Sequence, residues 1–330
     1  MATWSRLLGV TTALTLAVGV AAGCSSDDGG TTADGKVSVV ASTNVWGSVA
    51  QAVGGEHAEV TSLYTSPDGD PHEFEASAKD TAKVADAGVV VLNGGHYDAY
   101  MEAAAKNSKA IVVNAFDIME GDEHASDDHS ADDHGSDHAE DDHSHAPGAV
   151  NEHVFYNLTV VGQVADSIAN ALSEKDSTNT QYFRDNAAAF NEQIDELRGE
   201  LAAIKAADPG AKVVQTEPLA GYLLAEAGLD DITPAGLQDA VEAGQSPSAR
   251  DVAATQELIA DRTARVLIYN TQAVDDGTKA LLAIAEKAGV PVVDFTETFP
   301  TGTTDYIEWQ RANVEALSSA LAAGATSTSR

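Results

Sequence analysis

The chain has 330 residues, in which 52 Asp and Glu side chains stand against 18 Lys and Arg, for a formal net charge of −34. So acidic a surface repels nucleic acid and anionic lipid and concentrates cations, which excludes a nucleic-acid partner. Part of this acidity is explained by solubility alone. One cysteine allows no internal disulfide, so core packing must stabilise the fold, and about 290 ordered residues suffice for two domains.

The first 24 residues have the pattern of a bacterial lipoprotein signal. Arg6 precedes an apolar run over residues 7–22, and small residues lead to Cys24. A run of about 16 apolar residues is shorter than the ~20 that span a bilayer comfortably. We therefore predict a signal peptide over residues 1–23 and acylation of Cys24, which would hold the protein at the outer face of the cell membrane. The alternative is an ordinary signal peptide with an incidental cysteine.

Residues 24–36 are polar and rich in glycine, which predicts a flexible tether. The first lobe is then expected over residues 37–175. Strands are predicted at 37–42, 59–64, 88–92 and 111–116, and helices at 44–54, 76–86, 97–106 and 158–173. This alternation is typical of a parallel sheet covered by helices.

A His- and Asp-rich tract interrupts the first lobe, and we expect a disordered loop over residues 122–146. It has no apolar residue larger than alanine, so it cannot bury a core. Its six histidines would bind metal loosely near the main site; the alternative is a charged solubilising loop. These auxiliary, low-affinity ligands are His124, His129, His134, His138, His143 and His145.

A long helix is predicted over residues 180–207, because apolar side chains recur on one face from Phe183 to Ile204. At ~1.5 Å per residue it measures about 42 Å, and residues 176–208 would link the two lobes. The second lobe, residues 209–330, repeats the alternation. Its predicted strands are 212–216, 266–269 and 290–295, and its helices 218–227, 248–261, 276–288 and 305–323. The predicted fold is two α/β lobes, each with a mostly parallel sheet flanked by helices, joined by one long rigid helix.

Four candidate metal ligands follow predicted strands, directly or at the far end of a loop: His72, His153, Glu217 and Glu297. Ligands of open α/β sheets gather beyond the carboxyl ends of the strands, so these groups would meet in the cleft between the lobes. Two imidazoles and two carboxylates can enclose a divalent ion. Each has a plainer reading on its own: a surface histidine, a helix-initiating Glu217-Pro218, or a solvated loop acid.

The sequence resembles the zinc/manganese solute-binding proteins of bacterial ABC importers, the helical-backbone metal receptors. The resemblance covers about residues 37–323. It depends on the His-rich loop and on segments 70–75 (DPHEFE), 151–156 (NEHVFY), 215–222 (QTEPLAGY), 269–272 (YNTQ) and 291–298 (PVVDFTET). It implies that His72, His153, Glu217 and Glu297 hold a metal ion that is delivered to an ABC permease in the cytoplasmic membrane.

Two positions depart from the pattern of that family and leave the metal open. Many zinc-type members have histidine where this chain has Glu217, manganese-type members have glutamate there, and aspartate is common in place of Glu297. Carboxylate oxygen suits Mn²⁺, whereas the His-rich tract and the intrinsic affinity series favour Zn²⁺. We expect Zn²⁺ as bound cargo, with Mn²⁺ as the alternative, and no catalytic cofactor.

Three other classes of function compete with metal capture. A zinc hydrolase would keep an open coordination position, but this chain has no His-Glu-x-x-His motif and its four ligands would fill the site, so we predict no enzyme. A metal-dependent surface adhesin remains compatible with a lipid anchor. A receptor for a metal chelate would need a wider cleft rich in Arg or aromatic residues, and the chain has 18 aromatic residues.

Overall fold

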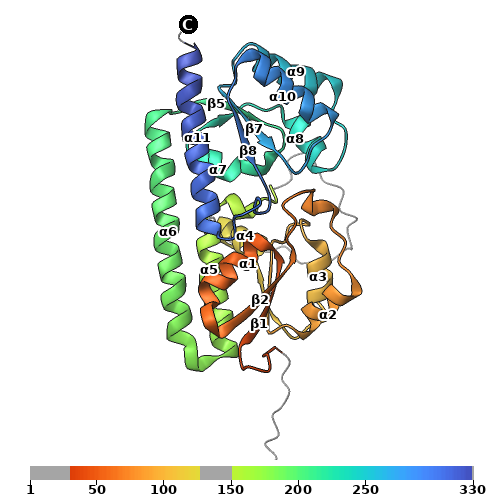
Figure 1. Ribbon diagram of the computed structural model, residues 1–330, viewed down its shortest axis with the longest axis vertical. Coiled ribbons are helices and arrows are strands. Elements are labelled where there is room, and N and C mark those ends of the chain that lie inside the picture. The colour runs from red at the N-terminus through yellow and green to blue at the C-terminus, as the bar shows by residue number, and fades with distance from the viewer. Residues whose placement is uncertain (1–29, 127–150, 329–330) are drawn as a thin grey trace, which may run out of the picture.

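Two four-stranded parallel sheets, one in each half of the chain, organise the structure (Figure 1). The computed structural model describes residues 30–126 and 151–328. The strand orders are β2-β1-β3-β4 and β6-β5-β7-β8, so the two lobes have the same topology. The predicted fold class is confirmed. Cys24 lies outside the described residues, and so do His129, His134, His138, His143 and His145.

The first lobe contains strands β1 to β4 and helices α1 to α5. The strands are β1 (Val37–Thr43), β2 (Ala58–Tyr64), β3 (Val89–Leu92) and β4 (Ile111–Asn114). The helices are α1 (Asn44–Gly54), α2 (Ala78–Asp86), α3 (Ala99–Ala105), α4 (Ala115–Ser126) and α5 (Leu158–Lys175). Short 3₁₀ turns lie at η1 (Gly55–His57), η2 (Pro71–Glu73), η3 (Val154–Tyr156) and η4 (Ser177–Asn179).

The central strands β1 and β3 of the first sheet are buried on both faces, which explains their valine-rich sequences, whereas Glu59 of edge strand β2 and Val112 of edge strand β4 are exposed. Val39 and Val91 point into a core shared with α1 and α5. Val40 and Val90, one position along each strand, pack on the opposite side against α2 and α3. The period of two along each strand therefore assigns successive valines to different helix layers.

The second lobe repeats this plan. Its strands are β5 (Lys212–Gln215), β6 (Asp230–Asp231), β7 (Val266–Asn270) and β8 (Val292–Phe295). Its helices are α7 (Gly221–Glu226), α8 (Ala235–Glu242), α9 (Ala249–Ala260), α10 (Asp276–Ala288) and α11 (Tyr306–Thr328), with a 3₁₀ turn at η5 (Pro218–Ala220). Val214 and Leu267 face α8, α9 and α10, whereas Val213 and Ile268 face the core that continues into the first lobe.

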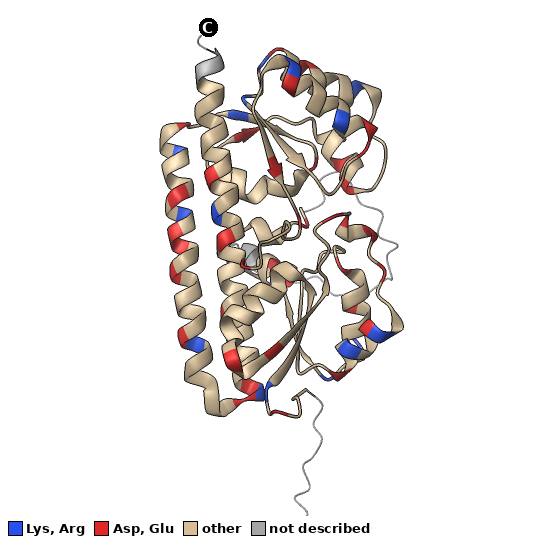
Figure 2. Ribbon diagram, in the orientation of Figure 1, with Lys and Arg blue, Asp and Glu red and all other residues tan. Residues whose placement is uncertain are grey.

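The long helix α6 (Thr180–Ala207) runs along the side of both lobes (Figure 1). Its buried side chains recur every three or four residues, as predicted: Phe183, Ala187, Phe190, Ile194, Leu197, Leu201 and Ile204. Its charged residues form bands along the helix (Figure 2). The helix contacts α1 and α5 of the first lobe and α7 and α11 of the second. A single hydrophobic cluster therefore extends through both lobes and resists their independent movement.

Several boundaries differ from the sequence predictions. The strand predicted over 111–116 ends at Asn114, because the Asn114 side chain accepts hydrogen bonds from the backbone N–H groups of Phe116 (3.1 Å) and Asp117 (3.3 Å) and starts α4. Helix α4 continues to Ser126 and includes His124, so the loop prediction is wrong for residues 122–126, and residues 127–146 lie outside the described residues. Helix α8 and the short strand β6 were not predicted from the sequence.

The predicted tether over residues 24–36 is wrong for residues 30–36, and residues 24–29 lie outside the described residues. Thr31 forms a β-bridge with Val37, and the N–H of Ser38 donates to the Gly30 carbonyl at 2.8 Å. Gly30 has φ +126° and lies so close to Gly88 that a Cβ would be 2.5 Å from its Cα. Residues 30–36 therefore belong to the first lobe. Within the described residues, no helix has the length and apolar character needed to cross a membrane.

Candidate metal centre

Each of the two histidines is held by a turn of the same type. His72 lies in η2, and its backbone N–H donates to Asp70 Oδ1 at 2.8 Å. His153 directly precedes η3, and its N–H donates to Asn151 Oδ1 at 2.9 Å. A side-chain oxygen that accepts from the N–H two residues later is the Asx turn favoured by Asp and Asn. Both imidazoles are thus positioned by the residue two places before them.

The two glutamates follow strands of the second sheet, and the order of those strands brings them together. Glu217 comes after β5 and Glu297 after β8, while β7 lies between these strands and ends at Asn270. The Asn270 Nδ2 group donates to Glu297 Oε1 at 2.9 Å and also to Glu217 Oε2. The amide therefore holds the two carboxylates side by side at the carboxyl edge of the sheet.

All four side chains meet between the lobes. One potential ligand atom from each of His72, His153, Glu217 and Glu297 lies within 4.8 Å of the others. His72 Nε2 is 3.3 Å and His153 Nε2 is 3.6 Å from Glu297 Oε2. The side chain of His72 is 25% exposed, whereas those of His153 and Glu297 are fully buried. Within the described residues this is the group of His, Cys, Asp or Glu side chains placed to hold a metal ion.

Two atoms of the group are buried and have no hydrogen-bond partner: His153 Nε2 and Glu297 Oε2. An unsatisfied buried polar atom costs roughly 1–3 kcal/mol, and more when it carries charge. The other polar atom of each side chain does have a partner. His153 Nδ1 lies 2.8 Å from Asn151 Oδ1, and Glu297 Oε1 accepts from Asn270. One face of each side chain is thus fixed by the protein and the other is left free for a cation.

The electrostatics of the site favour positive charge between the carboxylates. Burial lowers the pKa of His72, but contact with Glu297 outweighs it and raises this pKa from 6.5 to about 10. Burial likewise opposes the shift of His153, where Glu242 and Glu297 raise the pKa to about 9. Two imidazolium groups therefore face the carboxylates, and one divalent cation carries the same charge as the two protons that it would displace.

The two carboxyl groups respond in opposite directions. Burial, followed by the charge of Glu297, raises the pKa of Glu217 to about 7. Burial would also raise the pKa of Glu297, but the neighbouring His153 and His72 hold it well below its usual range. Glu297 is thus the ionised acid around which the two imidazoles gather.

Sequence reasoning missed several polar residues around this group. Asn151, Asn270 and Gln272 contact it directly. Asn270 is the last residue of β7 and Gln272 lies two residues beyond it, so both obey the same strand-end rule. Tyr97 stacks edge-on against His72, with ring centroids 4.6 Å apart. Glu242, at the end of α8, approaches His153 Nδ1 to 3.9 Å. Nothing in its local sequence pattern distinguishes Glu242 from a surface acid, so only the fold places it here.

Solved structures share this fold. The periplasmic zinc-binding protein TroA from Treponema pallidum matches with a TM-score of 0.68 at 17% identity, covering 87% of this chain and 99% of TroA. The laminin-binding protein Lmb of Streptococcus agalactiae matches with a TM-score of 0.65 at 22% identity, covering 86% of this chain and 99% of Lmb. The class defined by this fold is the two-lobed α/β protein with a long helix joining its lobes.

The chain belongs to the family described as zinc-uptake complex component A, periplasmic, whose model matches residues 39–320. The resemblance stated from the sequence motifs is therefore confirmed.

Relatives with names are also similar in sequence, but the alignments cover a smaller share of those relatives than of the solved structures. Zinc-binding protein AdcA of Streptococcus pyogenes is 25% identical over 303 residues, which is 86% of this chain and 56% of AdcA. The chain thus spans little more than half the length of this relative. The high-affinity zinc uptake system protein ZnuA of Bacillus subtilis is 28% identical over 263 residues, 76% of this chain and 77% of ZnuA. The manganese-binding lipoprotein MntA of B. subtilis is 28% identical over 200 residues, 59% of this chain and 60% of MntA.

Proposed function

We propose that this protein binds a divalent transition metal, Zn²⁺ in first place, outside the cytoplasm and delivers it to an ABC-type permease. The observation that carries the proposal is the convergence of His72, His153, Glu217 and Glu297 within 4.8 Å. Family membership supports the same conclusion. The bound metal is cargo, and the protein is a receptor without catalytic chemistry.

The spacing of the ligand atoms supports a tetrahedral ion. Ligands at about 2.1 Å from a zinc ion stand roughly 3.4 Å from one another in a tetrahedron. The two Nε2 atoms lie 3.3 Å and 3.6 Å from Glu297 Oε2, close to that edge length. Small side-chain shifts are enough to complete the shell, because the four atoms are already within 4.8 Å.

Zinc is favoured over manganese by donor type and coordination number. Two imidazole nitrogens suit Zn²⁺, and a given site binds Zn²⁺ more tightly than Mn²⁺. Relatives named for zinc include AdcA and ZnuA. Manganese is the second candidate, because two carboxylates supply oxygen ligands and MntA is named for manganese.

The location outside the cytoplasm depends on the N-terminal segment. We infer that cleavage before Cys24 leaves its thiol for acylation, so that the protein is held at the membrane through lipid alone. A relative, MntA, is named a lipoprotein, which supports the same inference for this chain. Mass spectrometry of the membrane-extracted protein would detect the acyl group, and a soluble form with a free Cys24 thiol would contradict it.

Metal analysis followed by competition tests the main proposal. Protein purified without added metal is expected to hold one equivalent of Zn²⁺, which Mn²⁺ in excess does not displace. The matched control is the double variant His72→Ala/His153→Ala, which keeps both carboxylates and is expected to be metal-free. Equal metal content in the two proteins would rule out this site.

A further inference from the structure

The buried amide of Gln272 connects the second-lobe part of the site to the first-lobe loop that carries His72. Its Oε1 accepts from the backbone N–H groups of Glu297 at 2.6 Å and Thr298 at 3.1 Å. Its Nε2 donates to Thr298 Oγ1 at 2.6 Å and to the carbonyl of Pro67 at 3.1 Å. A side chain that is only 6% exposed thus has all its polar capacity used.

Thr298 reinforces this connection. Its hydroxyl donates to the carbonyl of Ser66 at 2.7 Å, so Gln272 and Thr298 bind two consecutive carbonyls of the first lobe. Ser66 and Pro67 begin the loop that leads from β2 to His72. We call Gln272, Thr298 and these two carbonyls the inter-lobe latch.

The latch is also linked to the carboxylate pair. The backbone N–H of Gln272 donates to Asn270 Oδ1 at 2.9 Å, and Asn270 Nδ2 donates to Glu217 and to Glu297. A movement of the Glu297 backbone therefore shifts the Gln272 side chain through its Oε1 atom. The Nε2 atom of the same side chain donates to the Pro67 carbonyl, so the shift reaches the first lobe. Within one continuous hydrogen-bond network, the glutamates and the His72 loop share the same support.

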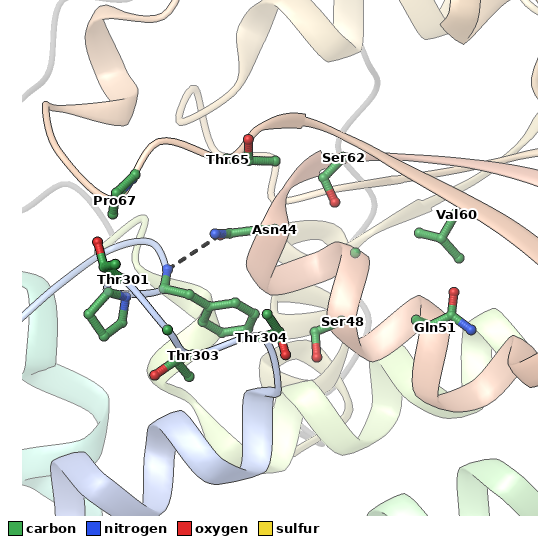
Figure 3. Close-up of a pocket in the computed structure, with 14 residues that line it drawn as sticks. Asn44, Ser48, Gln51, Val60, Ser62, Thr65, Pro67, Thr301, Thr303 and Thr304 are labelled. Atoms are coloured by element: carbon green, nitrogen blue, oxygen red, sulfur yellow. Dashed lines mark hydrogen bonds between the residues drawn. The ribbon is translucent and has the colours of Figure 1, made fainter.

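The loop that the latch holds is the most exposed part of the site. Asp68, Gly69 and His72 are exposed, whereas His153, Glu217 and Glu297 are buried. Next to Pro67 lies a groove of about 500 Å³. The residues that line it include Asn44, Ser48, Ser62, Thr65, Pro67 and Thr301. Figure 3 shows Thr65 and Pro67 at the edge of this groove, beside the hydrogen bond between Phe299 N–H and Asn44. Thr65 and Pro67 therefore border open space on one side, while Pro71 of the same loop is buried and the Tyr64 hydroxyl contacts the carbonyls of Asp68 at 3.4 Å and Gly69 at 3.0 Å.

We propose that Gln272, assisted by Thr298, is a positioning residue that keeps the His72 loop closed over the metal and thereby sets the rate of metal release. The inference rests on the proposed function of the site. Breaking the bonds to Ser66 and Pro67 frees the start of the His72 loop while leaving His153 and Glu217 on their own elements. Gln272→Ala also removes the acceptor of the Glu297 N–H, whereas Thr298→Val leaves that bond in place. Metal release then accelerates, and metal capture is slowed little.

The experiment measures release of Zn²⁺ from the loaded protein into excess chromophoric chelator, together with the association rate. We expect Gln272→Ala and Thr298→Val to raise the release rate about tenfold, equivalent to about 1.4 kcal/mol, with association within about twofold of the wild type. Thr298→Ser keeps the hydroxyl and is expected to restore slow release. Gln238→Ala is the matched control, because Gln238 Nε2 donates to Asp231 within the second lobe and not across the lobes.

The outcomes separate the latch from the proposed function and from general stability. Wild-type release rates in both Gln272→Ala and Thr298→Val would overturn the latch, even though the wild type still binds Zn²⁺. A wild type without tight binding would overturn the proposed function instead. If Gln272→Ala does not fold, the comparison of Thr298→Val with Thr298→Ser decides. A change of the association rate as large as that of the release rate, without recovery in Thr298→Ser, would indicate a purely structural role and contradict the proposal.

Discussion

His153 Nε2 lies 3.6 Å from Glu297 Oε2 across the boundary between the two lobes, and neither atom has a hydrogen-bond partner. The opposite side of each group is tightly held, His153 by Asn151 and Glu297 by Asn270. Each side chain is therefore fixed in orientation with its free atom toward the same point. This is the arrangement that a cation-binding site requires before the cation arrives.

Removing either imidazole should abolish tight metal binding without unfolding the protein. We expect His153→Ala and His72→Ala to lose more than about 100-fold in Zn²⁺ affinity, beyond the 10–100-fold typical for residues behind a ligand. Chelator competition measures the affinity and circular dichroism the fold. His57→Ala is the control, because His57 packs edge-on against Tyr182, with ring centroids 4.7 Å apart, outside the site. Unchanged affinity in His72→Ala would remove His72 from the site.

Asn270 should matter almost as much as a ligand, although it offers no metal-binding carboxylate. Asn270→Ala removes the amide that bridges Glu217 and Glu297, so the two acids lose their common donor and repel each other. We expect Zn²⁺ affinity to fall about 10–100-fold. Asn186→Ala, which removes a 3.0 Å hydrogen bond to the Val53 carbonyl away from the site, is expected to leave affinity intact. Equal affinities in the two variants would contradict a bridging role.

Asn151 should select the tautomer of His153. Its Oδ1 accepts from the His153 N–H and lies 2.8 Å from Nδ1, which places the ring proton on Nδ1 and leaves Nε2 for the metal. Asn151→Ala is expected to weaken Zn²⁺ binding about 10–100-fold, whereas Asn151→Asp retains the acceptor and most of the affinity. Nitrogen NMR of the imidazole in the Zn²⁺-loaded protein would report directly which nitrogen carries the proton. A loss in Asn151→Asp as large as in Asn151→Ala would point instead to the amide's other bond, to the Pro218 carbonyl.

Metal binding should release protons and tighten as the pH rises. The pKa values of His72 and His153 are raised from 6.5 to about 10 and about 9, so both imidazoles are protonated in the metal-free site at neutral pH. Binding must displace about two protons from the imidazoles and a further fraction of a proton from Glu217, whose pKa is raised to about 7. Calorimetry in buffers of different ionisation enthalpy would count them. Affinity that is constant between pH 6 and pH 8 would contradict this.

The stability of the metal-free protein should change in the opposite direction. Since both histidine pKa values are raised by folding, their contribution is complete below pH 6.5 and disappears as the pH rises through about 9 and 10. Melting temperatures of the metal-free protein are therefore expected to fall over this window. If the melting temperature of His72→Ala/His153→Ala does not fall over this window, the fall in the wild type comes from the two imidazoles. A fall of the same size in the double variant would show that other groups cause it.

The His-rich insertion should add weak sites and leave the tight one unchanged. Deleting residues 127–145 removes five of the six auxiliary histidines and retains helix α4. We expect one tight equivalent of Zn²⁺ to remain in the truncated protein while weaker equivalents disappear from the titration. Replacing the five histidines by asparagine in the full-length chain is the control that keeps the length and acidity of the insertion. Loss of the tight site in the truncated protein would show that the insertion supplies a ligand to it.

The sequence predicted the architecture well because local signals for it are strong. Valine-rich runs such as residues 88–92 have a single stable environment, a sheet covered on both faces. The spacing from Phe183 to Ile204 predicts one long helix with one buried face, and the structure has that helix over Thr180–Ala207. Errors occurred where a side chain decides a boundary, as Asn114 does by starting α4 in a segment that reads as strand.

The four candidate ligands could be named from the sequence because they follow predicted strands, directly or after a loop, and because the segments that contain them resemble those of the metal receptors. His72 and His153 each follow an Asp or Asn by two residues, and Glu217 and Glu297 each follow a strand. Their supporting residues could not be ranked in this way. Asn270 becomes a bridge only because β7 lies between β5 and β8, and Gln272 becomes a latch only because the two lobes meet at Pro67.

What the sequence determines by itself is the position of most strands and helices, and which side chains stand near their ends, because these depend mainly on near neighbours along the chain. Only the tertiary structure decides that an imidazole of one lobe faces a carboxylate of the other with neither hydrogen-bonded. That outcome depends on strand order and on the core along α6, which bring distant segments together and exclude water from between them.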